Sequence, residues 1–158
     1  MYEFLGYQVQ DVMSIPVSIV PQATLAEAEQ LLETRGFNAL PVVTREGQLV
    51  GVVTSLDLLK AFRFTEESIL PPYDEIMRRS VESVMCREPV SVRPRTPLTR
   101  VLEKLVATRD KSFPVVDEGR LVGVVAREDV MQALRRADAG ERPQQPLARP
   151  AEPGKQGA

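Results

Sequence analysis

The chain has 158 residues, 43% of them hydrophobic and 27% charged, with a formal net charge of -2 and a pI near 5.4. This balance is typical of a globular protein of one or two small domains, and no apolar run approaches the roughly 18 residues that cross a bilayer. The near-neutral charge also argues against a broad nucleic-acid-binding surface, which requires an excess of basic residues.

A short β-branched segment, VSIV, is the first predicted strand, and it ends at Pro21. A helix is predicted next because Thr24 is a favourable N-terminal cap and apolar residues then recur at helical spacing. Gly36 lies where a helix C-terminus favours a left-handed residue. The runs LPVV and LVGVV, joined by a turn at Gly47, predict a hairpin, and helical spacing returns after Thr54. The predicted order is strand, helix, strand, strand, helix.

Residues 62–80 connect these elements to a second set. The prolines Pro71 and Pro72 break this segment, and the stretch YDEIMRRSVESVM after them is predicted to form a connecting helix. The second set has the same order as the first. Its first helix is predicted to be capped by Thr96, with Pro97 in the first turn.

The two sets are copies of one unit. GVVTSLDLL from Gly51 returns as GVVAREDVM from Gly123, 72 residues later, and VMSIPVSIV from Val12 is echoed by VMCREPVSV from Val84. Self-similarity of this kind is the signature of an internal repeat. The predicted organisation is one module over residues 1–137, made of repeat one (9–62), a linker (63–80) and repeat two (81–136), followed by a proline-rich, disordered tail (138–158).

A unit of about 50 residues buries too little apolar surface to be stable alone. We therefore expect an α+β fold in which the two repeats pack face to face about an internal pseudo-twofold axis. Gly51 and Gly123 are interpreted as positions of close packing or of a bulge, without a role in ligand binding.

The ordered landmarks of each copy are the VM start, the hairpin from PVV to LVGVV, and the ending G-h-h-T-x-x-D, in which h is apolar. Together they resemble a tandem pair of cystathionine β-synthase (CBS) domains, often called a Bateman module, over residues 9–136. The resemblance implies a disc-like pseudo-dimer with two clefts between the repeats. In this family the clefts often bind AMP, ADP, ATP or S-adenosylmethionine as regulatory ligands, and no cofactor is required.

The pair Thr54 and Asp57 has two interpretations. An ionised carboxylate at Asp57 can accept both hydrogen bonds of a ribose diol, and the Thr54 hydroxyl at a helix N-terminus suits phosphate or ribose oxygens. The alternative is purely structural, because threonine and aspartate at these positions commonly cap a helix and complement its dipole. The residues alone leave both interpretations open.

By position, the resemblance implies a main cleft around Asp57. Lys111 would be a cation facing the phosphates there. The predicted ligand-binding residues of the main cleft are Thr54, Asp57, Val90, Lys111, Ser112 and Phe113.

The resemblance also implies a second, weaker cleft around Asp129, where Ala126 replaces the threonine. Asn38 takes the position of Lys111 in this cleft, and losing the charge-assisted hydrogen bond of that lysine, about 1.5 to 3 kcal/mol, is enough to separate the affinities of two sites. Arg127 is a candidate to compensate for the lost hydroxyl. The predicted ligand-binding residues of this cleft are Asp129, Arg127, Val17, Asn38, Ala39 and Leu40.

Catalysis and metal binding are not expected. The sequence has no histidine, the commonest general base and metal ligand, and Cys86 is its only cysteine. The N-terminus shows no basic region followed by an apolar stretch, so a cytoplasmic location is expected, without membrane or nucleic-acid partners.

The leading hypothesis is a regulatory, energy-sensing module that binds an adenosine compound and signals to an unknown effector protein by a conformational change. The alternative is a structural or dimerisation module whose clefts bind nothing, which the loss of threonine at Ala126 favours for one cleft. The resemblance further implies a homodimer formed through the helical faces.

Overall fold

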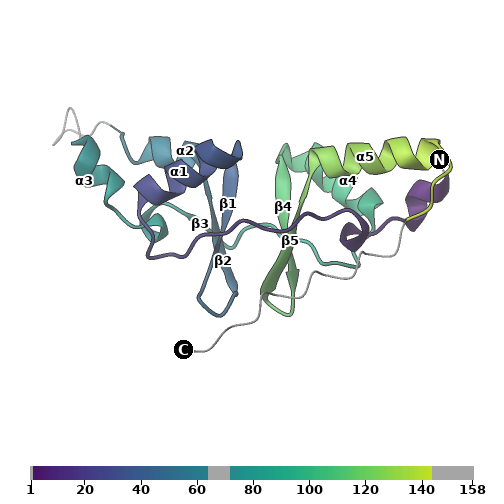
Figure 1. Ribbon diagram of the computed structural model, residues 1–158, viewed down its shortest axis with the longest axis horizontal. Coiled ribbons are helices and arrows are strands. Elements are labelled where there is room, and N and C mark those ends of the chain that lie inside the picture. The colour runs from purple at the N-terminus through teal and green to yellow at the C-terminus, as the bar shows by residue number, and fades with distance from the viewer. Residues whose placement is uncertain (1, 64–71, 144–158) are drawn as a thin grey trace. The chain divides into compact units, whose positions relative to one another are not determined.

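The computed structural model describes residues 2–63 and 72–143, a mixture of helices and short strands (Figure 1). The first half contains η1 (Tyr2–Gly6), η2 (Val9–Asp11), α1 (Leu25–Arg35), β1 (Ala39–Val43), β2 (Leu49–Thr54) and α2 (Ser55–Lys60). The second half contains α3 (Tyr73–Met77), η3 (Val81–Ser83), β3 (Cys86–Arg87), α4 (Leu98–Thr108), β4 (Ser112–Asp117), β5 (Arg120–Ala126) and α5 (Arg127–Asp138). The α+β class and the two copies are confirmed.

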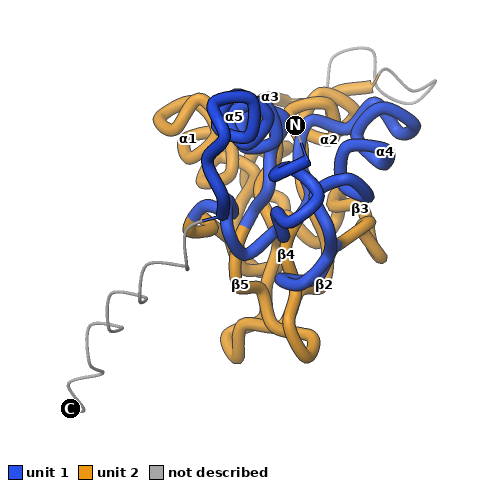
Figure 2. The backbone as a smooth tube through the Cα atoms, turned by 90° about the vertical axis from the view of Figure 1, so that its right-hand side faces the viewer, with its two compact units in different colours: residues 1–14, 92–113, 124–158 blue, residues 15–91, 114–123 orange. Residues whose placement is uncertain are grey.

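The backbone contacts divide the chain into two compact units, and each unit draws on both sequence repeats (Figure 2). Unit 1 consists of residues 1–14, 92–113 and 124–158, and unit 2 consists of residues 15–91 and 114–123. The first residues of each repeat therefore belong to a different unit from most of that repeat.

Unit 2 is built on the antiparallel sheet β1-β2-β3. Strand β1 is buried along nearly its whole length. Leu40, Val42 and Val53 are fully buried in a core shared with α1 and α3. The prediction of a strand at VSIV is wrong. The segment is reduced to a single parallel bridge from Ile19 to Val42, because Pro16 and Pro21 flank it and cannot donate to a ladder.

The cap of α1 is confirmed, whereas the expected cap of α4 is wrong. Thr24 Oγ1 accepts from the Glu27 amide at 3.2 Å, and Gly36 ends α1 with a φ of 65°. In α4 the N-terminal cap is Pro97, and Thr96 Oγ1 instead accepts from the Arg93 amide at 3.0 Å in the preceding turn. A proline has no side-chain acceptor, so α4 starts without a side-chain cap.

Strand β3 was not predicted. Its residues Cys86 and Arg87 pair with Val52 and Gly51 of β2. A side chain at Gly51 would place its Cβ 2.8 Å from both the Cys86 carbonyl oxygen and Met85 Sδ. The interpretation of Gly51 as a close-packing position is therefore confirmed.

In unit 1 the segment before the first repeat is part of the core. Phe4 and Tyr7 are buried, and their rings stack with centroids 6.3 Å apart. The 3-10 helix η1 packs against both α4 and α5. The following residues pair with repeat two, because Ser14 and Val124 exchange backbone hydrogen bonds of 2.9 and 3.0 Å. The N-terminal segment is therefore a structural part of repeat two.

The same exchange occurs in unit 2, with the repeats reversed. Val52 of repeat one pairs with Cys86, the residue that corresponds to Ser14. The backbone amide of Val81 donates to the Ala23 carbonyl at 2.7 Å, as that of Val9 donates to Thr96 in unit 1. Each repeat therefore supplies the opening segment of the other.

The turns of the two hairpins also meet within unit 2. The amide of Leu49 donates to the Gly119 carbonyl at 3.1 Å, and the amide of Leu121 donates to the Gly47 carbonyl at 3.0 Å. Leu49 and Leu121 are 72 residues apart, as are Gly47 and Gly119, so the two bonds are equivalent under exchange of the repeats. This local twofold relationship agrees with a duplicated unit.

The connecting segment and the tail differ from their predictions. In place of one connecting helix, α3 ends at Met77 and η3 follows at Val81. The first residues of the expected disordered tail are held in place: Tyr7 Oη donates to the Glu141 carbonyl at 3.1 Å, and Arg136 Nε pairs with the Glu141 carboxylate at 3.0 Å. The predicted break at Pro71 and the tail from residue 144 lie outside the described residues.

Candidate functional site

The junction between β2 and α2 holds the pair Thr54 and Asp57. Thr54 is the N-terminal cap of α2, and its Oγ1 accepts from the Asp57 amide at 3.2 Å. Asp57 Oδ2 in turn accepts from the Thr54 amide at 2.8 Å and from the Thr54 hydroxyl at 2.9 Å. Both residues are half-buried. The capping interpretation is therefore satisfied, and one carboxylate oxygen carries both of these bonds.

The junction between β5 and α5 has the same geometry with two hydrogen bonds fewer. Asp129 Oδ2 accepts from the Ala126 amide at 2.7 Å, and alanine has no hydroxyl to donate to the carboxylate or to accept from the Asp129 amide. Burial raises the pKa of the Asp129 carboxyl above its ordinary value, with a smaller contribution from Glu128, while the hydrogen bond from Ala126 acts in the opposite direction. The two copies of the motif therefore differ in the hydrogen bonds that their aspartates accept as well as in composition.

Arg127 points away from the carboxylate of its own junction. Its guanidinium donates to two backbone carbonyls just after α4, to Asp110 at 3.0 Å and to Arg109 at 2.7 Å. Arg109 ends α4 with a φ of 59°. The side chain of Arg127 therefore satisfies carbonyls at the end of α4, a role that the sequence did not reveal.

In unit 2, three residues predicted for the second cleft lie beside Thr54. Asn38 accepts from the Ser55 amide at 3.1 Å, and Ala39 and Leu40 pair with Thr54 and Val53 in the sheet. Leu40 is fully buried, main chain included, so it belongs to the core. Val17 of the same predicted set packs against the unit 2 core.

In unit 1 the corresponding residues predicted for the main cleft lie beside the second junction. The main-chain carbonyl of Lys111 accepts from the Arg127 amide at 3.1 Å, and the carbonyl of Asn38 accepts from the Ser55 amide in the same way. Lys111 is exposed, Ser112 is half-buried and Phe113 is 1% exposed, so Phe113 belongs to the core. Val90, in unit 2, is 49% exposed.

Each acidic junction is thus placed next to residues of its own repeat. The assignment of Lys111, Ser112 and Phe113 to the Asp57 cleft, and of Asn38, Ala39 and Leu40 to the Asp129 cleft, stays a prediction. Within residues 2–63 and 72–143 no group of three potential metal ligands comes together. No helix in these same ranges is long and apolar enough to cross a membrane.

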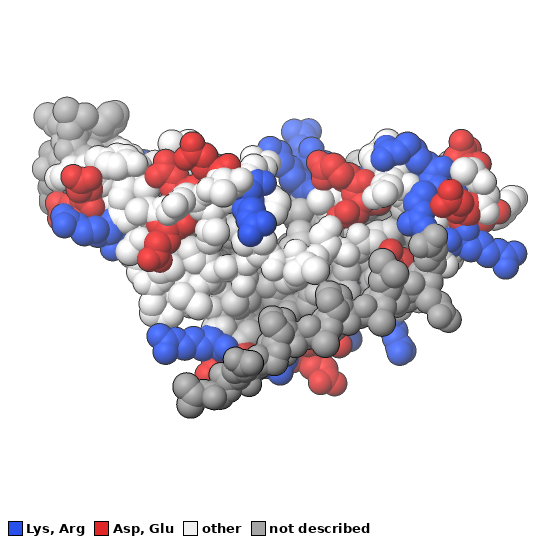
Figure 3. Space-filling model, viewed as in Figure 1, with Lys and Arg blue, Asp and Glu red and all other residues white. Residues whose placement is uncertain are grey.

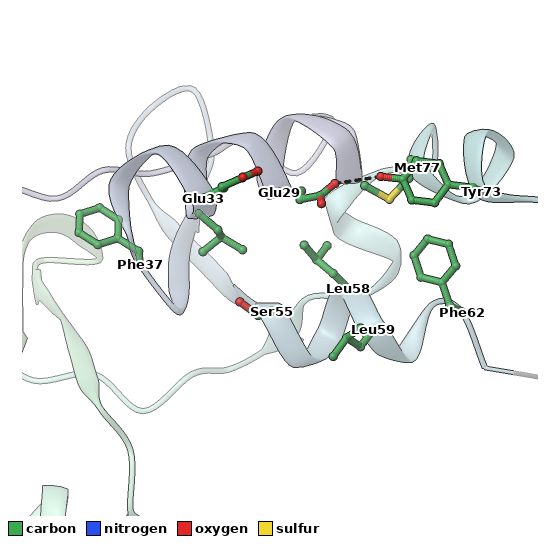
Figure 4. Close-up of a pocket in the computed structure, with 10 residues that line it drawn as sticks. Glu29, Glu33, Phe37, Ser55, Leu58, Leu59, Phe62, Tyr73 and Met77 are labelled. Atoms are coloured by element: carbon green, nitrogen blue, oxygen red, sulfur yellow. Dashed lines mark hydrogen bonds between the residues drawn. The ribbon is translucent and has the colours of Figure 1, made fainter.

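A groove that the sequence did not predict lies among α1, α2 and α3 of unit 2 (Figure 4). It encloses about 670 Å³. Leu32, Leu58 and Met77 form its buried part, and the rings of Phe62 and Tyr73 stack at one end with centroids 5.7 Å apart. Helical periodicity places these residues on one face of each helix, but only the packing of three helices shows that they enclose a groove.

A family model describing the CBS domain matches the chain twice, over residues 9–63 and 81–136. The chain belongs to the CBS domain family. Each match contains one copy of the strand-to-helix junction described above.

Solved structures of two CBS-pair proteins are similar to this chain over nearly their whole length. CBSX2 of Arabidopsis thaliana is 29% identical, with a TM-score of 0.74 over 85% of this chain and 98% of that chain. A structure of CBSX2 in complex with AMP gives a TM-score of 0.73. The CBS domain pair of the protein MJ0100, in complex with 5'-methylthioadenosine and S-adenosyl-L-methionine, is 27% identical, with a TM-score of 0.65 over 83% of this chain and 98% of that chain.

Among curated relatives, the A-adding tRNA nucleotidyltransferase of Aquifex aeolicus is 28% identical over 134 residues. The match covers 84% of this chain but 15% of the relative. The CBS pair of this chain therefore corresponds to a small part of that enzyme.

Proposed function

We propose that this chain is a regulatory module that binds an adenosine compound and transmits a conformational change to a partner protein. The candidate ligands are AMP, ADP, ATP and S-adenosylmethionine. The related CBS pairs CBSX2 and MJ0100 were solved with AMP, 5'-methylthioadenosine and S-adenosylmethionine, which supports this class of ligand.

The hydrogen bonding of the Asp57 carboxylate is the main support for this function. Its Oδ2 accepts two hydrogen bonds from Thr54, and no described residue donates to its Oδ1. A carboxylate has about four acceptor positions, so it can cap α2 and still accept from a ribose hydroxyl. The capping bonds fix the orientation of the carboxylate, which lowers the entropic cost of binding a diol.

Lys111 is the proposed phosphate contact of the same site, and Val90, Ser112 and the Phe113 main chain are its proposed walls. The Asp129 site, with Arg127, Val17, Asn38, Ala39 and Leu40, is proposed to be weaker. Arg127 is committed to the carbonyls of Arg109 and Asp110, and the Asp129 carboxyl loses charge more readily because burial raises its pKa.

Thermal unfolding with AMP, ADP, ATP, S-adenosylmethionine and GMP as a control tests this function. A ligand at 100 times its dissociation constant stabilises the folded state by about 2.7 kcal/mol, which is easily measured. The informative variant is Asp57→Asn, because the amide oxygen can still accept from the Thr54 amide whereas the amide nitrogen cannot accept from a ribose hydroxyl. Asp129→Asn is the matched control.

The expected result is stabilisation by one adenosine compound that is lost in Asp57→Asn and retained in Asp129→Asn. No stabilisation by any of the four compounds would instead favour the alternative, a structural or dimerisation module. Lys111→Ala separates the ligands, because it should weaken a nucleotide more than S-adenosylmethionine.

A homodimer is proposed in addition, since several apolar helix residues are exposed, among them Leu59 at 68% and Val106 at 72%. Light scattering at several concentrations measures the mass directly. A monomer of 17.6 kDa at all concentrations would contradict the dimer without bearing on ligand binding.

A further inference from the structure

The connection between α4 and β4 consists of Arg109, Asp110 and Lys111, and the carbonyl of each accepts a hydrogen bond from Arg127. The guanidinium donates from Nη2 to Arg109 at 2.7 Å and from Nε to Asp110 at 3.0 Å. The backbone amide donates to Lys111 at 3.1 Å. All four residues belong to unit 1, and Arg127 is the first residue of α5. One residue of α5 therefore holds the whole connection.

The corresponding connection of repeat one is held by a single bond of this kind. The carbonyl of Asn38 accepts from the Ser55 amide at 3.1 Å. The Ser55 side chain donates to no described residue, and it is too short to reach two further carbonyls. Helix α1 instead ends at Gly36 with a φ of 65°, and the Phe37 amide closes the last turn on the Leu32 carbonyl at 3.0 Å. Repeat one therefore needs no arginine at this place.

The connection of repeat two has a less favourable backbone. Arg109 has a φ of 59°, in the left-handed region where a residue with a Cβ is disfavoured. The Asp110 amide donates to Thr108 Oγ1 at 3.3 Å, where repeat one has a backbone carbonyl as acceptor. A residue in a disfavoured conformation keeps it only when the contacts around it hold it there. Arg127 supplies these contacts.

The cation carried by this connection is Lys111. It is exposed, and no Asp or Glu side chain in the described part of the chain pairs with it. Basic and acidic side chains are interspersed over α5 on the face shown in Figure 3, and α5 carries as many acidic as basic residues. The surface as a whole therefore does not select an anion, and an individual cation has to be placed for it.

We propose that Arg127 is a positioning residue, which holds the connection so that the Lys111 ammonium is in place for the phosphate groups of the ligand. This inference rests on the proposed function, in which Lys111 contacts the phosphates. A fixed backbone limits the space that the flexible lysine samples, which lowers the entropic cost of its contact. Arg127 acts through Lys111 and thereby favours nucleotides over uncharged adenosine compounds.

Isothermal titration calorimetry with ATP and with adenosine tests the inference on the full chain. Lys111→Ala is expected to weaken ATP binding about tenfold, the loss of one charge-assisted hydrogen bond. Arg127→Ala is expected to weaken it about threefold or more and to leave adenosine binding unchanged. In the double variant Arg127→Ala with Lys111→Ala, ATP should bind as in Lys111→Ala alone, because Arg127 acts only through the lysine.

Two further variants separate positioning from charge. Arg127→Lys keeps the positive charge but replaces the planar fork of donors by one ammonium, so it is expected to bind ATP as weakly as Arg127→Ala. Arg136→Ala is the matched control, because Arg136 lies on the same helix and its Nε binds the Glu141 carboxylate at 3.0 Å. This control should bind ATP like the unsubstituted chain.

Hydrogen exchange without ligand follows the connection itself. The amides of residues 109–112 are expected to exchange faster in Arg127→Ala and at the original rate in Arg136→Ala. Arg127 is exposed, so its substitution leaves the buried core unchanged.

Four results would overturn the inference and leave the proposed function standing. They are equal weakening of ATP and adenosine in Arg127→Ala, a further loss of ATP affinity in the double variant, full ATP affinity in Arg127→Lys, and unchanged hydrogen exchange. An unsubstituted chain that binds neither ATP nor adenosine would contradict the proposed phosphate contact of Lys111, and the inference would fail with it.

Discussion

Ser14 of repeat one and Val124 of repeat two exchange both of their backbone hydrogen bonds, at 2.9 and 3.0 Å. The counterpart pair, Val52 and Cys86, connects repeat two to the sheet of repeat one. Because each repeat completes its fold with a segment of the other, the first residues of the chain contribute directly to the stability of repeat two.

Tyr7 tests this contribution. It is 1% exposed, and its hydroxyl donates to the Glu141 carbonyl at 3.1 Å. Tyr7→Ala is expected to lower the free energy of unfolding by about 3 to 5 kcal/mol, as for other large aromatic residues truncated in a core. Tyr7→Phe removes the hydrogen bond alone and is expected to cost about 1 kcal/mol. Urea unfolding measures both, and equal losses for the two variants would mean that the ring contributes little.

Gly51 is expected to tolerate no side chain. In Gly51→Ala the new Cβ would lie 2.8 Å from the Cys86 carbonyl oxygen, a backbone atom that cannot move without breaking the pairing of β2 with β3. A loss of about 1 to 3 kcal/mol is expected from urea unfolding. Gly6→Ala is the control, because its Cβ would approach only Pro143 at 3.8 Å. The assignment of close packing would be wrong if Gly51→Ala were as stable as Gly6→Ala.

The two strand-to-helix junctions allow a reciprocal exchange of residues. Thr54→Ala removes the hydroxyl that bonds the Asp57 amide and carboxylate, and it is expected to cost about 1 kcal/mol. Ala126→Thr supplies the missing hydroxyl at the start of α5 and is expected to stabilise by a similar amount. Thermal unfolding without ligand measures both changes. Destabilisation by Ala126→Thr would show that the second junction lacks room for the threonine side chain.

Stability is expected to depend on pH through Asp129. Its pKa is raised in the folded protein, chiefly by burial, so its contribution to stability is fully present below about pH 4 and is lost as the pH rises through the folded pKa. Asp129→Asn cannot ionise, so its stability relative to the unsubstituted protein should increase between about pH 3 and pH 7. Glu128→Gln should reduce this dependence in part. Urea unfolding across this range measures the change, and a relative stability independent of pH would contradict it.

The sequence predicted the elements that depend on local signals. Thr24 caps α1 and Gly36 ends it as expected, and the 72-residue offset identified both copies of the junction motif. The failed strand VSIV and the failed cap at Thr96 reflect nearby prolines, whereas other elements depend on distant partners. The pairing of Ser14 with Val124 joins residues far apart in the chain, and nothing in the local pattern indicates which repeat the VM segment completes.

The candidate site was predictable in part for the same reason. The T-x-x-D spacing implies a contact between Thr54 and Asp57, and the structure contains it. The direction of Arg127 depends on the carbonyls of Arg109 and Asp110, which come free only because α4 ends there. The groove of unit 2 depends on three helices at once, so the apolar residues Phe37 and Leu59 could not be recognised as one surface.

The reciprocal hydrogen bonds at the hairpin turns have a consequence for how the two halves find each other. Leu49 to Gly119 and Leu121 to Gly47 are the same contact made twice, so a single repeat could make it with a repeat of a separate chain, as in a twofold interface. Covalent linkage gives the neighbouring repeat a high effective concentration. Two repeats on separate chains would lack this advantage, and each could pair with a repeat of any other chain. The linker around residues 63–80 therefore favours pairing of the two repeats within one chain.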